Sequence, residues 1–159
     1  MHTGSLLSLR TRPAPWLERL APGLSLLAPC RQLQHGQALW MRLGLDEWWC
    51  WQGDEAAAPA LAQAIAEAAG AALHACVDLS DAQACCLLPA PAEALLSAGC
   101  DLDWERLPAD FAGRTRLAAF TVVLAPEASQ DGALRLWLES SLAQSLGAWL
   151  AQTAALQRQ

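Results

Sequence analysis

The chain has 159 residues, of which 54% are hydrophobic and 16% are charged. That length is enough for a substantial hydrophobic core, and the composition excludes a disordered chain. Ten arginines and no lysines stand against sixteen acidic residues, which gives a net charge of −6 and a pI near 4.9. Binding to nucleic acid needs a basic patch, so the sequence predicts no nucleic-acid partner.

Residues 1–33 are predicted to form a proline-broken N-terminal arm. Its prolines and one glycine divide it into pieces too short for a long helix: Pro13, Pro15, Pro22, Gly23 and Pro29. Pro15 to Leu20 can still form one helical turn that carries Trp16. The arm is expected to be either a loosely attached terminus or a docking segment. Residues 34–159 are predicted to form a single α+β domain, the N-terminal part of a longer protein.

A first antiparallel hairpin is predicted over residues about 37–52. Apolar residues alternate along residues 39–45, with Trp40 and Arg42 on the opposite face, which is typical of a half-buried strand. The stretch "EWWCWQ", residues 47–52, then returns as a second strand. Both of its faces are apolar, so both are expected to be covered, one by the core and the other by a helix, the arm or a partner.

An alanine-rich helix is predicted over residues about 55–73, with Asp54 as its N-cap and Glu55 in its first turn. The apolar stretch from residue 56 to 76 is interrupted by Pro59, Glu67 and other breaks, so it predicts no membrane span. A short strand near residues 74–80 and a short helix over 91–98 are expected to follow.

A second antiparallel hairpin is predicted over residues about 115–139, with strands at 115–125 and 132–139. Asp131-Gly132 at the end of the connection is a strong hairpin signal. A C-terminal amphipathic helix is expected over residues about 141–156, because its leucines and Trp149 share one stripe. The predicted fold class is therefore α+β, with two hairpins packed against two helices.

No catalytic, cofactor or metal site is predicted. The sequence contains no nucleophile elbow, phosphate-binding glycine loop or zinc-protease motif. His35 and His74 are isolated, and Asp101 and Asp103 are interpreted as solvated charges. The six cysteines lack metal-ligand spacing and are interpreted as free thiols in a reducing compartment. The sequence therefore predicts a protein that is not an enzyme.

Tryptophan is the feature that remains: eight Trp accompany two Phe and no Tyr. Trp concentrates binding energy at protein interfaces, although most of these rings are expected to lie in a core. Some of them compete for faces that one small domain cannot cover alone. The predicted protein-interaction residues are Trp16, Trp48, Trp51, Trp137 and Trp149.

Two stretches resemble a known family. "LQHGQALWMRLGLDEWWCW" followed by the alanine-rich helix, and "LRLWLESSLAQSLGAWL" with Trp137, Leu138 and Ser141, are similar to the N-terminal region of the type III secretion cytoplasmic-ring proteins. This is the YscQ/SctQ-like family (HrcQ, SpaO), related to the flagellar switch proteins FliM and FliN. The likeness covers residues 34–150 in outline. The β-rich modules that follow in family members are not found in these 159 residues.

The resemblance implies a non-enzymatic scaffold of the secretion sorting platform, a virulence apparatus. Its partners would be the ATPase stator (SctL-like), the membrane-ring linker (SctK-like) and chaperone–effector complexes. The protein would be cytoplasmic and peripheral to the inner-membrane secretion apparatus, without inserting into the membrane. An alternative is a small acidic type III secretion chaperone that binds an effector segment. A symmetric homodimer would favour the chaperone, and a monomer or heterocomplex would favour the platform.

Overall fold

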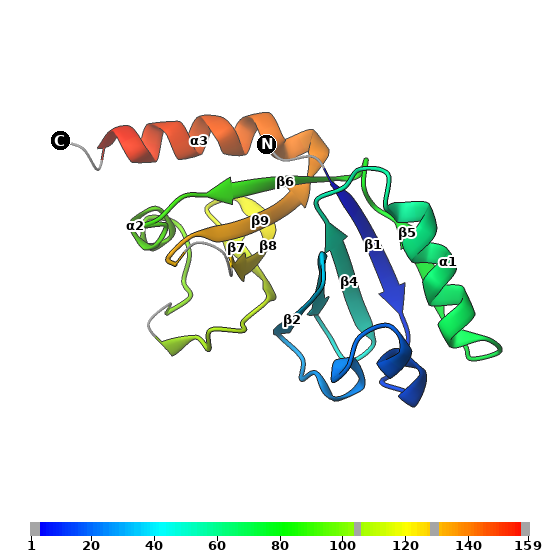
Figure 1. The fold of residues 1–159 in the computed structure, drawn as a ribbon. Coiled ribbons are helices and arrows are strands. Elements are labelled where there is room, and N and C mark those ends of the chain that lie inside the picture. The colour runs from blue at the N-terminus through cyan, green and yellow to red at the C-terminus, as the bar shows by residue number, and fades with distance from the viewer. Residues whose placement is uncertain (1–3, 104–105, 128–130, 157–159) are drawn as a thin grey trace. The chain divides into compact units, whose positions relative to one another are not determined.

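The structure is a computed structural model that describes residues 4–103, 106–127 and 131–156. The chain divides into two compact units, an N-terminal unit of residues Thr3–Asp81 and a C-terminal unit that contains Ala82–Gln159. Each unit has its own antiparallel sheet (Figure 1). Each also has its own hydrophobic core. The boundary between the units falls after residue 81, whereas the sequence predicts one boundary, after residue 33. Residues 1–3 of the predicted arm and 128–130 of the second hairpin's connection lie outside the described residues.

The N-terminal unit is built on a five-stranded antiparallel sheet in the order β2-β3-β4-β1-β5. The predicted first hairpin forms as two of these strands, joined by a short turn and paired from Leu39–Trp51 to Arg42–Trp48. The strands are β1 (Ser5–Arg10), β2 (Arg31–His35), β3 (Ala38–Arg42), β4 (Glu47–Gln52) and β5 (Ala75–Asp78).

Strand β1 comes from the stretch predicted as an arm. It lies between β4 and β5, so that both of its edges are paired. All five prolines or glycines that suggested an arm follow this strand, from Pro13 onward, and none interrupts residues 5–10. The prolines fall instead beside two short 3-10 helices, η1 (Pro15–Arg19) and η2 (Leu24–Leu26).

One face of this sheet is covered by η1, η2 and helix α1 (Ala58–Ala69). The apolar side of α1 presents Leu61 and Ile65 to the same core as Leu7 and Leu9 of β1. Alanine at the remaining contact positions of α1 lets the helix approach the strands closely. The loop between η1 and η2 is held by Glu18, whose carboxylate accepts hydrogen bonds from Ser25 and from the Gly23 backbone.

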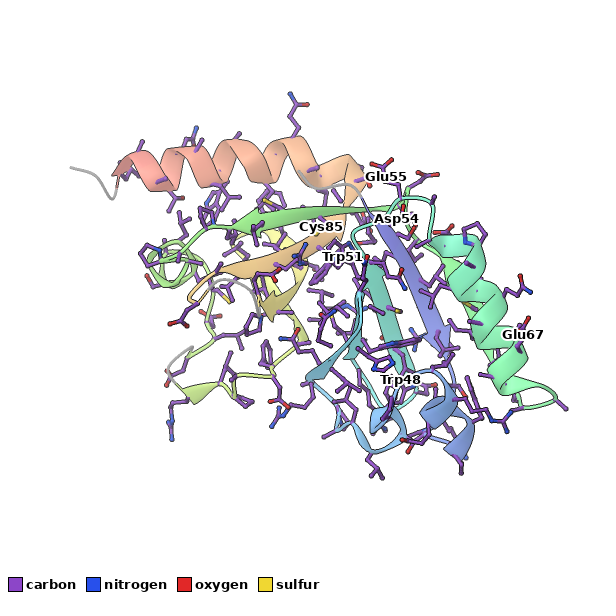
Figure 2. The ribbon with its side chains drawn as sticks, in the orientation of Figure 1. Trp48, Trp51, Asp54, Glu55, Glu67 and Cys85 are labelled. Atoms are coloured by element: carbon purple, nitrogen blue, oxygen red, sulfur yellow. The ribbon has the colours of Figure 1, made fainter. Side chains whose placement is uncertain are left out.

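Helix α1 begins three residues later than predicted, and Asp54 is not its N-cap. The Asp54 carboxylate accepts a hydrogen bond from the Ala56 N–H at 2.9 Å and so belongs to the turn before the helix. The N–H of Ala58 instead donates to the Ser5 hydroxyl at 3.0 Å, which is supplied by β1. That hydroxyl satisfies one of the free donors of the first helical turn from a distant part of the chain. Figure 2 shows Asp54 near the start of α1.

The C-terminal unit is built on a four-stranded antiparallel sheet in the order β6-β9-β8-β7. The segment predicted as one strand at 115–125 is two strands, because the chain reverses at Ala118–Ala119 and pairs Leu117 with Phe120. Strands β8 and β9 then form the predicted second hairpin. The strands are β6 (Gln83–Leu88), β7 (Gly113–Leu117), β8 (Phe120–Pro126) and β9 (Leu134–Glu139).

Two helices contribute to the core of this unit, α2 (Glu93–Ser97) and α3 (Ala143–Leu156), the latter preceded by the 3-10 turn η4 (Ser140–Leu142). Leu96 of α2 and Leu146 of α3 pack with Leu124, Leu136 and Leu138 of the sheet. The predicted α+β class, with both hairpins and both long helices, is therefore confirmed. Among the described residues, no helix is both long and apolar enough to span a membrane.

Candidate functional site

Trp48 lies at the centre of the N-terminal core and has no exposed surface. Its indole N–H donates to the Thr11 carbonyl at 3.0 Å, and the Arg42 guanidinium carbon lies 4.9 Å from its ring centroid. Arg42 is itself buried and donates to the carbonyls of Leu27, Gly44 and Leu45. Burial lowers the pKa of the Arg42 guanidinium. Trp48 therefore orders the interior of this unit.

Trp51 occupies the opposite face of β4 and is half-buried. Figure 2 shows Trp48 and Trp51 towards opposite ends of this strand. The Trp51 ring lies over two glycines: a Cβ atom at Gly4 would lie 2.9 Å from the Trp51 Nε1, and one at Gly53 3.5 Å from its Cη2. Close approach of the ring thus depends on the missing side chain at Gly4, whereas the distance at Gly53 is an ordinary van der Waals contact.

Trp137 and Trp149 belong to the C-terminal unit. Trp137 is buried and lies beside Cys85 and Val123 of the neighbouring strands. Trp149 is partly buried against the core of the unit, and its ring lies over Gly99, where an added Cβ would stand 2.8 Å from the ring and 3.1 Å from the Ala118 nitrogen. Trp48 and Trp137 are each buried within their own unit, and the role of the five predicted residues in partner binding stays a prediction.

The N-terminal unit contains a cleft that the sequence did not predict, with a volume of about 610 Å³. Four segments meet there: the end of β1, the start of η1, the turn before β4, and the connection from α1 to β5. Trp16 is the only predicted site residue in its lining. The lining residues are Arg10, Thr11, Arg12, Ala14, Trp16, Asp46, Ala72, Leu73, His74 and Ala75.

One side of the cleft is aromatic. The Trp16 and His74 rings are tilted by 59° with their centroids 6.0 Å apart, and Trp16 belongs to the hydrophobic core. The His74 Nδ1 donates to the Ala72 carbonyl at 2.9 Å, which fixes the ring against the α1–β5 connection. Leu73, which lies between Ala72 and His74 in the sequence, is 96% exposed.

The two arginines of the cleft differ in their partners. Arg10 forms ion pairs with Asp46 at 3.5 Å and with Glu47 at 3.4 Å. Arg12 is exposed and forms no ion pair with any described residue. The positive charge of Arg12 is therefore available to an anion, although the protein as a whole is acidic.

Thr11 fixes the backbone between these arginines. Its N–H donates to the Asp46 carbonyl at 3.0 Å, and its hydroxyl lies 3.4 Å from the Leu73 carbonyl. Its own carbonyl accepts the Trp48 indole N–H. Two segments, residues 46–48 and the α1–β5 connection, thus hold one buried residue, so that the cleft wall is tied to the core.

The buried thiols of Cys50 and Cys85 are poorly suited to nucleophilic chemistry at neutral pH. Burial raises the pKa of Cys50, and it raises the pKa of Cys85 to about 11, although the nearby Arg135 lowers the latter in part. Arg135 also forms a largely buried ion pair with Glu127. Such thiols stay protonated and unreactive at pH 7. Within the described ranges, no three His, Cys, Asp or Glu side chains gather closely enough to hold a metal ion.

Comparison with known proteins places the fold. No protein-family model and no curated protein sequence matches the chain. A chain of the heterotetrameric sarcosine oxidase from Corynebacterium sp. U-96, solved in complex with pyrrole 2-carboxylate, is similar with a TM-score of 0.79 and 23% identity over 98% of this chain and 81% of that one. The glycine cleavage system aminomethyltransferase T from Bartonella henselae is similar with a TM-score of 0.70 and 14% identity over 92% of this chain and 43% of that one.

These similarities overturn the resemblance to type III secretion ring proteins. The fold is shared with components of metabolic enzymes, so the sorting-platform function, its association with virulence and the stator, linker and chaperone–effector partners are wrong. The location beside a secretion apparatus loses its support, and the alternative of a secretion chaperone gains none. The resemblance rested on alternating apolar residues and a leucine stripe, and any antiparallel sheet covered by a helix produces these patterns.

Proposed function

We propose that this chain is a non-catalytic subunit of a hetero-oligomeric oxidase that acts on sarcosine or a related N-methylated amine. In this proposal the oxidation takes place in partner chains. The observation that supports it is the extent of the structural match, which takes in nearly the whole of this chain and four-fifths of one chain of a heterotetrameric oxidase. A subunit of that kind contributes by binding its partners and stabilising the assembly.

The similarity to the aminomethyltransferase supports a narrower conclusion. It spans 43% of that enzyme's chain, so most of that enzyme lies outside the match. The shared part is a folding unit that recurs in enzymes of different activity, and a shared fold alone assigns no reaction. The oxidase is favoured because 81% of its matched chain is covered, against 43% of the aminomethyltransferase.

The test is purification of the tagged full-length protein from its native cells under mild conditions. We expect other chains to co-purify in fixed stoichiometry, and the assembly to consume oxygen when sarcosine is added. The same chain produced alone is expected to consume none under the same conditions. An untagged strain carried through the same purification is the matched control.

Two results would overturn this proposal. One is a chain that stays alone during purification from cells that oxidise sarcosine. The other is sarcosine-dependent oxygen uptake by the isolated chain, which would place the chemistry on this polypeptide. Mass measurement of the intact assembly, together with oxygen electrode traces, separates these outcomes.

A further inference from the structure

The cleft of the N-terminal unit has the properties of a small-molecule site. Its volume of about 610 Å³ lies in the range of about 300–1,000 Å³ that ligand pockets occupy. Its walls come from residues 10–16, Asp46 and residues 72–75, all of one compact unit. The cleft is thus complete within a single folded body.

The aromatic side of the cleft is suited to a flat apolar group. The half-buried His74 ring packs at 59° against Trp16, which is 7% exposed, so His74 and the accessible part of Trp16 are the aromatic surface that the cleft offers. Leu73 adds an apolar side chain that is almost wholly exposed and is itself a lining residue. A planar ligand in the cleft would contact the rings and remove apolar surface of Leu73 from water.

The charged side of the cleft is suited to an anion. Arg10 is already neutralised by Asp46 and Glu47, which leaves the Arg12 guanidinium as the available cation. A guanidinium binds carboxylate and phosphate groups through two parallel N–H bonds. Thr11, held by hydrogen bonds to residues 46–48 and to Leu73, fixes the backbone from which Arg12 projects. The backbone at residues 11–12 is therefore ordered before any ligand arrives, whereas the exposed Arg12 side chain is ordered by the ligand itself.

We propose that this cleft binds a small planar aromatic anion, with the ring of the ligand against Trp16 and His74 and its anionic group on Arg12. Such a site differs from a protein-binding surface, because only the Arg12 guanidinium and the rings of Trp16 and His74 would recognise the ligand. It does not rest on the proposed oxidase role, and it holds whatever assembly the chain enters.

The experiment is an NMR titration of the ¹⁵N-labelled full-length chain with 2-naphthoate. We expect the amide signals of Thr11, Arg12 and His74 and the Trp16 indole signal to shift together, with a dissociation constant of about 1 mM or below. Naphthalene-2-carboxamide keeps the ring without the charge, and acetate keeps the charge without the ring. Each is expected to bind about fivefold more weakly or worse. With 2-naphthyl phosphate, tighter binding than naphthoate would identify a phosphate ligand and weaker binding a carboxylate.

Variants connect binding to the proposed contacts. Arg12→Gln is expected to weaken naphthoate binding about fivefold, and Arg12→Lys is expected to restore part of it. Arg19→Gln is the matched control, because Arg19 is also an exposed arginine of the N-terminal unit but does not line the cleft. Since Arg12 is exposed, its replacement leaves the fold intact, which the unchanged spectrum outside the cleft will verify.

Three results would overturn the proposal. The first is the absence of shifts at the cleft residues when naphthoate is added. The second is equal binding of naphthoate and its carboxamide, which would show that the charge is not recognised. The third is an equal loss of affinity in Arg12→Gln and Arg19→Gln. That result would mean that naphthoate affinity depends on the net charge of the protein and not on the arginine in the cleft.

Discussion

The N-terminal unit covers one face of its sheet with a core that contains indole rings, whereas the core of the C-terminal unit consists mainly of leucine. In the first, Trp48 directs its N–H to one carbonyl and stacks under Arg42. In the second, Leu124, Leu136 and Leu138 make contacts that have no preferred direction. Of two antiparallel sheets in one chain, one is thus stabilised by a directional hydrogen bond and an arginine–indole contact, and the other by hydrophobic contacts without a preferred direction.

The largest expected effect is that of Trp48→Ala. It removes a fully buried ring, its hydrogen bond to Thr11 and the surface on which Arg42 stacks, so we expect a loss of about 4 kcal/mol in the free energy of unfolding. Chemical denaturation measures the loss, and hydrogen exchange locates it. We expect the amides of β1, β3 and β4 to lose protection.

Trp48→Phe is the matched variant for this experiment, because it keeps an aromatic ring and removes the N–H donor. The Thr11 carbonyl then loses its partner in a buried place, which costs about 1–3 kcal/mol. If Trp48→Phe were as stable as the native protein, the oriented hydrogen bond would contribute nothing, and the contrast between the two cores would fail.

The next largest effect is expected for Leu136→Ala in the C-terminal unit. This side chain is fully buried, and its truncation costs about 3 kcal/mol through lost burial and the cavity that remains. Leu136→Met conserves volume and is expected to cost less than about 1.5 kcal/mol. Exchange should accelerate in β6, β8 and β9. Equal acceleration in β1 and β4 would mean that the two units unfold as one cooperative body.

The smallest effects concern two residues with left-handed backbone, one in each unit. Cys30 has φ 58° and Ala118 has φ 52°, conformations that cost L-residues energy and glycine little. We expect Cys30→Gly and Ala118→Gly each to raise the melting temperature slightly, by a net gain of about 0.5 kcal/mol. Ala119→Gly, in the same turn as Ala118, gains no such relief and is expected to lower it. If differential scanning calorimetry gave Ala119→Gly a higher melting temperature than Ala118→Gly, the left-handed backbone at Ala118 would not be what costs stability in this turn.

The sequence predicted most of the local structure, because strands 38–52 and helices 58–69 and 143–156 carry clear periodicity. Strand β1 was missed because its pairing with two distant strands, and not its six residues, decides its conformation. The turn at Ala118–Ala119 was missed because neither residue is a usual turn former. The burial of Trp48 depends on which face of β4 receives α1, and alternation alone does not determine that.

The cleft could be predicted only in part. Arg10 and Arg12 lie on either side of Thr11, just before the first proline of the chain. This placement indicates that charged residues stand at the end of a secondary-structure element. Their neighbours Asp46 and His74 come from segments that lie 34 to 64 residues away in the sequence, and only the sheet order brings them together. Sequence periodicity carries no information on such distances.

The contact between Gly99 and Trp149 has a consequence for how this protein changes over evolutionary time. A side chain at residue 99 would collide with the indole at 2.8 Å and stand tightly, at 3.1 Å, against the Ala118 nitrogen, so a larger residue there is admissible only after the ring at 149 has become smaller. The two positions are therefore expected to vary as a pair among related sequences. The order of substitution is constrained as well: position 149 changes first, and position 99 follows.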